Sequence, residues 1–184
     1  MMSYKMKKHY FNYQLAMNSN EINDFINQFG ISNFLGVFAV DELWRIAGDY
    51  EGVFIFNTDP SYKTGQHWIA ICISEKCLLY FDPLAAFENT TTEIQTLVKR
   101  IGKSFIYNNM WVQSYDSSNC GFHCLVFCFI MSKRPSLKTY TKYLKSFLSC
   151  RTIEEREQLS LSYFSIIERK ITYNNIPEHI RHEN

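Results

Sequence analysis

An uncharged, apolar segment near residue 120 places the strongest constraint on how this chain folds. It runs from Phe122 to Met131 (FHCLVFCFIM), and cysteines recur every four residues at 120, 124 and 128. Residues four apart share one face of a helix, so the pattern predicts a helix from Cys120 to Met131. Because the helix has no charged face, it is expected to be buried in a core. It is too short to cross a bilayer.

The composition supplies a domain in which such a helix can be buried. The chain has 184 residues, of which 46% are hydrophobic and 16% aromatic, which excludes intrinsic disorder. No repeat, low-complexity tract or linker divides it, so residues 1–184 are expected to form one domain. Within it, residues 1–17 are a basic lead-in and residues 135–184 a C-terminal helical part. No apolar stretch follows the first lysines, so we expect a protein that is not secreted.

The charges are nearly balanced, with 19 Lys and Arg against 18 Asp and Glu, a net charge of +1. This excludes a function that depends on bulk electrostatics, though not a local basic patch. Basic residues do occur at helical spacing, at 133, 134, 138, 142 and 145. A solvated helix face is the simpler interpretation, and contact with nucleic-acid phosphates is the alternative.

The six cysteines lie at positions 72, 77, 120, 124, 128 and 150 and include no CxxC pair. The sequence therefore predicts no zinc or other metal site and no thioredoxin-like motif. Neighbours on one helix face cannot bond comfortably to each other, so free thiols in a reducing, intracellular compartment are expected. Cys124 and Cys128 are expected to be inert thiols of the core.

Periodicity and turn residues predict the remaining elements. We expect helices at 22–29 (capped by Ser19 or Asn20 and stopped by Gly30), 94–101, 140–148 and after Thr152, and strands at 53–56, 68–73, 77–81, 105–107 and 110–113. This order predicts an α+β fold in which helices pack on a small, mixed, mainly antiparallel sheet.

Three residues at the ends of these elements have the types that thiol catalysis requires. Cys120 lies at the start of the buried helix, where backbone N–H groups and the helix dipole favour a thiolate. His67 ends a glycine-containing turn just before one strand, and Asp82 directly follows the next strand. If the two strands form a hairpin, the Asp82 carboxylate can reach Nδ1 of His67 and orient the ring.

Further residues complete this candidate site. Gln113 lies seven residues before Cys120 and can direct its amide at a developing oxyanion, while Gly121 leaves room for substrate. His123 is a rival base, but from the same helix as Cys120 it has little freedom to transfer protons. Each residue alone also fits a structural role, such as a core cysteine or a strand-ending Asp-Pro. Their order along the chain favours a site.

These residues resemble a known family. The quoted motifs are Asn57-Thr58, His67-Trp68 (in FNTDPSYKTGQHW), YFDP at 80–83, and Gln113-Ser114 before NCGFHC at 119–124, with FLGVF upstream at 34–38. Together they resemble the adenovirus endopeptidase (adenain) family of cysteine proteases, in clan CE, and cover residues 20–135. Adenain-like enzymes also occur in adintoviruses, adomaviruses and Polinton-type elements, so membership of one of these groups is an alternative. The wider clan also includes proteases of SUMO and NEDD8.

The resemblance implies a role for each residue. Cys120 would be the nucleophile at the start of a buried helix, His67 would be its base, and Asp82 would orient His67. Gln113 would share the oxyanion hole with the Cys120 N–H. Trp68 would form the wall of a channel that accepts glycine. The chemistry would need no cofactor. The family uses an activating peptide, tethered through a cysteine, and DNA. This chain has no cysteine between Cys77 and Cys120, which argues against a tether there.

The resemblance also implies a substrate and a place of action. The chain would be a thiol endopeptidase that cleaves viral capsid or core precursors at Gly-containing sites during virion maturation, in the virion and the host nucleus or cytoplasm, with no membrane partner. One alternative is a deconjugating protease for a ubiquitin-like modifier, which shares the same catalytic residues. The other is an inactive binding module, which the presence of all four residues disfavours.

Overall fold

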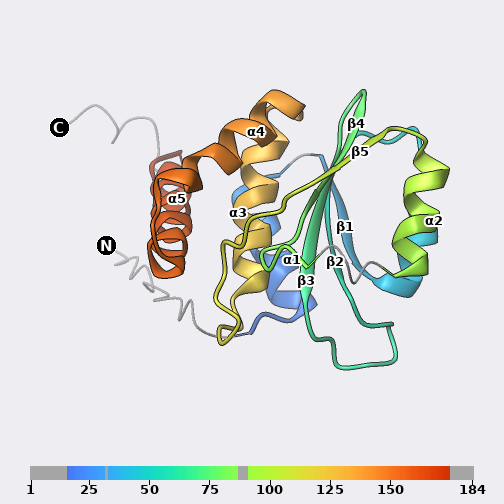
Figure 1. The fold of residues 1–184 in the computed structure, drawn as a ribbon, viewed down its shortest axis with the longest axis horizontal. Helices are drawn as coiled ribbons and strands as arrows, with labels where there is room; N and C mark the ends of the chain where they lie inside the picture. The colour runs from blue at the N-terminus through green and yellow to red at the C-terminus, as the bar shows by residue number, and fades with distance from the viewer. Residues whose placement is uncertain (1–15, 32, 87–90, 175–184) are drawn as a thin grey trace, which may run out of the picture.

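The computed structural model describes residues 16–31, 33–86 and 91–174, the last five of these without side chains. A sheet stands at the centre, with helices on both faces (Figure 1). Its strands are β1 (Phe34–Ala39), β2 (Gly52–Asn57), β3 (Trp68–Ile73), β4 (Cys77–Phe81) and β5 (Ser104–Tyr107). They lie side by side in sequence order.

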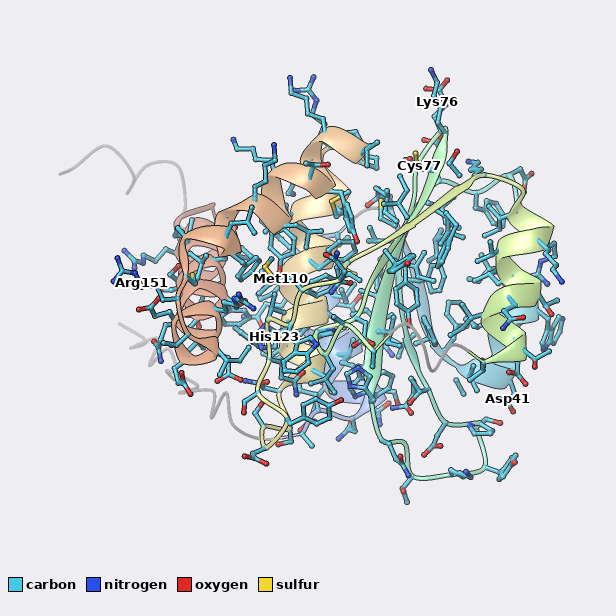
Figure 2. The ribbon with its side chains drawn as sticks, viewed as in Figure 1. Asp41, Lys76, Cys77, Met110, His123 and Arg151 are labelled. Atoms are coloured by element: carbon cyan, nitrogen blue, oxygen red, sulfur yellow. The ribbon has the colours of Figure 1, made fainter. Side chains whose placement is uncertain are left out.

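The sheet is mixed, and the predicted α+β fold is confirmed. The three central strands, β2 to β4, are antiparallel to one another, whereas the outer strands β1 and β5 run parallel to β2 and β4, respectively. The hairpin between β3 and β4 turns at its tip beside Lys76 and Cys77, at the end of the sheet away from the loop between β2 and β3 (Figure 2). The start of β3 and the end of β4 therefore meet at one edge of the sheet.

Alternating side chains bury both faces of the central strands. In β2, Val53 and Ile55 join one hydrophobic cluster, while Phe54 and Phe56 join the other. The first cluster is closed by helices α1 (Ser19–Phe29), α3 (Cys120–Lys133), α4 (Leu137–Ser146) and α5 (Ile153–Asn174). The second is closed by the 3-10 helix η1 (Val40–Arg45) and by α2 (Thr92–Ile101), on the opposite face (Figure 1).

Helix α3 is the buried helix that the sequence predicts, and Cys120 is its first residue. Its side chains are buried from Cys120 to Cys128 without a break. The sheet covers one side, and α1, α4 and α5 cover the others. This arrangement explains why no face of the helix carries charge. A short 3-10 helix, η3 (Phe147–Ser149), links α4 to α5.

Two strand assignments differ between the sequence prediction and the structure. The predicted strand at 110–113 is wrong: the N–H groups of Val112 and Gln113 both donate to the carbonyl of Pro83 (2.9 and 3.2 Å), so this segment forms a loop instead of a ladder. Strand β1 was not predicted, because Gly36 interrupts its apolar pattern. None of the described helices has the length and apolar character needed to cross a membrane.

Candidate active site

The candidate nucleophile, Cys120, lies where the start of α3 meets the edge of the sheet. The residue before the helix, Asn119, makes no side-chain hydrogen bond to the first turn; its Oδ1 accepts one from the Ser117 hydroxyl (2.8 Å). The side chain of Asn119, the N-cap residue, therefore leaves the N–H groups of the first turn uncapped. The positive end of the helix dipole is directed at Cys120, an arrangement that favours a thiolate there.

His67 and Asp82 come together as the hairpin of β3 and β4 predicts. His67 Nε2 lies 2.7 Å from Oδ1 of Asp82. The carboxylate also accepts hydrogen bonds from the N–H groups of Leu84 (2.8 Å) and Ala86 (3.0 Å), which fix its orientation. The prediction that Asp82 pairs with Nδ1 is wrong. Because Asp82 takes Nε2, Nδ1 is the ring nitrogen left for Cys120, whose side chain also interacts with His67.

The surroundings of His67 favour a protonated ring. Burial alone lowers its pKa, but hydrogen bonds and charge interactions with Asp82 and Cys120 outweigh burial and raise the pKa from 6.5 to about 9. At neutral pH the imidazole therefore holds a proton, and its positive charge lies beside the Cys120 side chain, which interacts with the ring. Thiol catalysis uses an ion pair of an imidazolium and a thiolate, and His67 with Cys120 is the candidate for that pair.

The backbone N–H and carbonyl of Trp68 each contact a cysteine of α3, and sequence analysis missed both contacts. Its N–H donates to Sγ of Cys120 (3.4 Å), and the thiol of Cys124 donates to its carbonyl (3.3 Å). Burial raises the pKa of Cys124 well above its usual range, so the thiol keeps the proton that it donates. Cys124 is thus more than a core thiol. It attaches the start of β3, next to His67, to the first turns of α3.

Gln113 is buried in the loop between β5 and α3 and lies at the same cavity as Cys120. Its Nε2 donates one hydrogen bond to the carbonyl of Ser117 (2.8 Å), so the amide is fixed and its second N–H remains for another acceptor. Helix α5 supports this loop. Oε1 of Glu157 accepts from Ser114 N–H (2.9 Å), and Arg156 donates to the carbonyl of Trp111 (2.7 Å).

Trp68 and Gly121 form one wall with the segment before α1. The indole N–H of Trp68 donates to the carbonyl of Met17 (2.7 Å). A Cβ on Gly121 would lie 3.2 Å from Met17 Cβ and 3.2 Å from Trp68 Cδ1. The expectation that Gly121 leaves room for substrate is therefore corrected. The room is taken by Trp68 and Met17, and they line the cavity.

These residues surround a cavity of about 750 Å³ at the edge of the sheet. Cys120, His67 and Gln113 lie on one part of its lining, and the end of β1 with the loop after β2 forms another part. A cavity of this size holds several residues of an extended peptide. Among the described residues, no group of three His, Cys, Asp or Glu side chains is placed to hold a metal ion.

His123 is separate from this site. It projects from α3 toward α5, where Nδ1 lies 3.0 Å from the hydroxyl of Ser160 (Figure 2). Full burial lowers its pKa to about 3, so the ring is neutral at physiological pH. It has neither the position nor the exposure of a rival base. Cys72 and Cys128 are buried too, and burial raises the pKa of both thiols.

A scan against protein-family models and a search of curated proteins gave no match. Among solved structures, the chain is similar to the ASFV pS273R protease, with a TM-score of 0.47 and 16% identity over 79% of this chain and 67% of that one. It is also similar to ChlaDub1 of Chlamydia trachomatis and to the Chlamydia trachomatis effector Cdu1 bound to ubiquitin. Both have TM-scores of 0.47 and 16% identity, covering 89% of this chain and 83% and 84% of theirs. These TM-scores and identities are too low to indicate a function, so any function proposed for this chain must rest on its own residues.

Proposed function

We propose that this chain is a thiol endopeptidase with Cys120 as its nucleophile. The observation that carries the proposal is the sequence of contacts from Asp82 through His67 to Cys120 at a cavity open to substrate. A buried carboxylate, a protonated imidazole and a thiol at a helix start are the three groups that acyl transfer to sulfur uses. A merely structural core would not require them to meet at a cavity.

The geometry supports an ordered reaction. The Cys120 thiolate attacks the carbonyl carbon of the peptide bond, and the electron pair of the C=O bond moves to oxygen. Collapse of this intermediate breaks the C–N bond, and His67 gives its proton to the leaving amine. Water, deprotonated by His67, then attacks the thioester carbon, the C–S bond breaks, and the carboxylic acid product leaves with the thiolate–imidazolium pair restored. Asp82 holds the ring throughout.

Two donors are available for the oxyanion in this scheme. The free N–H of the Gln113 amide is one, and the backbone N–H of Cys120 is the other. Both are fixed before substrate binds: Gln113 by Ser117, and Cys120 by its place in α3. Donors that need no rearrangement are the ones that contribute most to transition-state stabilisation.

The proposed substrates are polypeptides with glycine beside the scissile bond. Trp68 and Met17 wall the cavity next to Cys120, and an indole fixed by a hydrogen bond leaves little room for side chains. The motif resemblance supports viral structural precursors as natural substrates, with maturation in the virion and in the host nucleus or cytoplasm.

Peptide hydrolysis tests this proposal. Purified protein is incubated with Gly-Gly peptides, with their Ala and Val counterparts, and with ubiquitin-like fusions, with and without DNA. We expect cleavage after glycine that Cys120→Ala and His67→Ala abolish and that Cys150→Ala, a cysteine outside the cavity, leaves unchanged. Absence of cleavage across the panel, or cleavage that persists in Cys120→Ala, would overturn the proposal. Cleavage of the fusions alone would favour a deconjugating protease.

A further inference from the structure

Two buried asparagines end strands at the edge of the sheet where the candidate site lies. Asn57 is the last residue of β2 and is 7% exposed; Asn108 directly follows β5 and is 1% exposed. Strand β2 lies next to β3, which His67 precedes, and β5 lies next to β4, which Asp82 follows. Each asparagine thus lies beside one member of the His67–Asp82 pair.

The Asn57 side chain holds both ends of the loop that carries His67. Its Oδ1 accepts hydrogen bonds from the N–H groups of Asp59 (2.9 Å) and Gln66 (3.2 Å), one near the start of the loop and one next to His67. The Thr58 N–H closes the loop by donating to the carbonyl of His67 (2.9 Å).

The loop also packs directly on this side chain. Gly65 has a φ of +86°, and a Cβ there would lie 2.7 Å from Nδ2 of Asn57. Only a residue without a Cβ lets the loop approach the amide so closely. The loop before His67 is therefore held in two ways, by the packing of Gly65 on the Asn57 amide and by the hydrogen bond from Gln66 to its oxygen.

Asn108 holds the backbone of Asp82 by two hydrogen bonds. Its Oδ1 accepts from the N–H of Asp82 (2.8 Å), and its Nδ2 donates to the carbonyl of Asp82 (2.7 Å). The same Nδ2 also lies 3.2 Å from the carbonyl of Met110. Unlike Asn57, this residue uses both its oxygen and its nitrogen.

We infer that Asn57 and Asn108 are positioning residues that set the distance between His67 and Asp82, and so keep the imidazole directed at Cys120. The inference rests on the proposed function, but it concerns the ion pair and not the substrate. Neither asparagine touches the reacting atoms. Buried amides are costly unless their hydrogen bonds are made, and in both residues those bonds go to the backbone of the segments that carry the pair.

The two asparagines predict different responses to the same substitutions. The Asn57 side chain makes its hydrogen bonds to the loop through its oxygen alone, as an acceptor. Asn57→Ala should therefore lower kcat about 10- to 100-fold with KM little altered. Asn57→Asp keeps the acceptor and should restore kcat to within a few-fold of wild type. At Asn108 the nitrogen is needed as well, so Asn108→Asp should not restore what Asn108→Ala loses. A purely structural role predicts no such difference.

A readout without substrate separates this inference from the proposed function. The rate at which iodoacetamide alkylates Cys120 is measured by mass spectrometry from pH 5 to 9. In wild type, the ion pair should keep Cys120 reactive at acidic pH. In Asn57→Ala and in both Asn108 variants, the half-maximal rate should shift to higher pH, and in Asn57→Asp it should stay near the wild-type position.

Ser74→Ala is the matched control. Ser74 is a buried residue whose hydroxyl bridges the N–H and carbonyl of Cys77 in the β3–β4 turn, at the other end of the sheet. It should lower the Tm without moving the alkylation profile or kcat. The inference fails if Asn57→Ala behaves like Ser74→Ala, or if Asp restores function at Asn108 as it does at Asn57. An inactive wild type with the expected alkylation profiles would overturn the proposed function alone.

Discussion

His67, directly before β3, and His123, on α3, differ in what surrounds their rings. His67 lies against a carboxylate and a thiol, which raise its pKa to about 9 in spite of burial. His123 is wholly buried with a serine hydroxyl beside Nδ1, and burial lowers its pKa to about 3. Near neutral pH, His67 therefore takes up a proton on folding, whereas His123 stays neutral in the folded chain.

These opposite shifts predict opposite effects of pH on stability. Between pH 6.5 and about 9 the folded chain holds a proton on His67 that the unfolded chain has lost, so this contribution is complete below pH 6.5 and disappears as the pH rises through 9. For His123, the unfolded chain gains a proton below pH 6.5 that the folded chain does not, so stability falls as the pH falls toward 3.

Thermal unfolding across this range measures both effects. His67→Gln should flatten the decline of Tm between pH 6.5 and 9, and His123→Gln should flatten the decline below pH 6.5. Each variant should leave the slope in the other range unchanged. Curves for the variants that run parallel to wild type throughout would contradict the assigned environments.

Gln113 allows a direct test of the oxyanion donor. Gln113→Ala should lower kcat by about 10²–10³ with KM little changed, because the lost N–H acts in the transition state. Gln113→Glu should lose as much, since a carboxylate offers no donor to the oxyanion. Steady-state kinetics measure this, with Gln95→Ala on α2, an exposed glutamine on the other face of the sheet, as the control. An unchanged kcat would place the donor elsewhere.

Among the helices and strands, the sequence predicts the bounds best where the residues at the ends have a conformational preference that stops the element. Gly30 and Gly102 adopt the left-handed conformation that ends α1 and α2, as expected for glycine after a helix. Strands β3 and β4 have the predicted bounds, because buried apolar runs flank a polar turn. The cap of α1 is Asn18, one residue before those expected. Since β3 and β4 were predictable, so was the meeting of His67 with Asp82.

What the sequence could not predict depends on contacts between distant segments. The segment at 110–113 has the composition of a strand, but the N–H groups of Val112 and Gln113 donate to the carbonyl of Pro83, 29 and 30 residues earlier. The rotation of the His67 ring, with Nε2 toward Asp82, depends on side chains that meet only in the fold, so no local pattern encodes it. Met17, in the lead-in, contacts Trp68 across 51 positions in sequence.

The contact between the start of α3 and the start of β3 makes Gly121 sensitive to a single methyl group. Gly121→Ala would place a Cβ 3.2 Å from Met17 and Trp68, so the indole must shift. We expect lower activity and altered tryptophan fluorescence. Gly48→Ala, whose nearest neighbour would lie at 3.4 Å in a region away from the cavity, should change neither. Wild-type kinetics in Gly121→Ala would show that the indole position does not matter.

At the scale of the whole molecule, the candidate site lies where the sheet and the helices packed on one of its faces meet. His67 and Asp82 belong to the sheet edge, whereas Cys120 belongs to the helix packed on that sheet. The packing of α3 on β3 thus fixes the distance between nucleophile and base. Helix α5 lies outside α3 (Figure 1) and reaches the same site through the loop that holds Gln113. The C-terminal helix therefore contributes to the site although it carries none of its reacting groups.

The wall of the cavity predicts the substrate preference of the whole enzyme. If Trp68 excludes side chains beside the scissile bond, kcat/KM should fall steeply from Gly to Ala to Val in a peptide series. Trp68→Ala should lower overall activity yet narrow the difference between Gly and Val. Wild-type cleavage of bulky residues as fast as glycine would remove the case for a glycine channel.

Every step of the proposed reaction depends on Cys120 acting as a nucleophile toward a peptide carbonyl. The most direct measurement is the intact mass of the protein after incubation with a Gly-Gly peptide that carries an electrophilic vinyl ester in place of the scissile bond. We predict one adduct per chain, located on Cys120 by peptide mapping, absent in Cys120→Ala and strongly slowed in His67→Ala. An adduct on Cys150 instead, or one that forms as fast without His67, would contradict the proposed function.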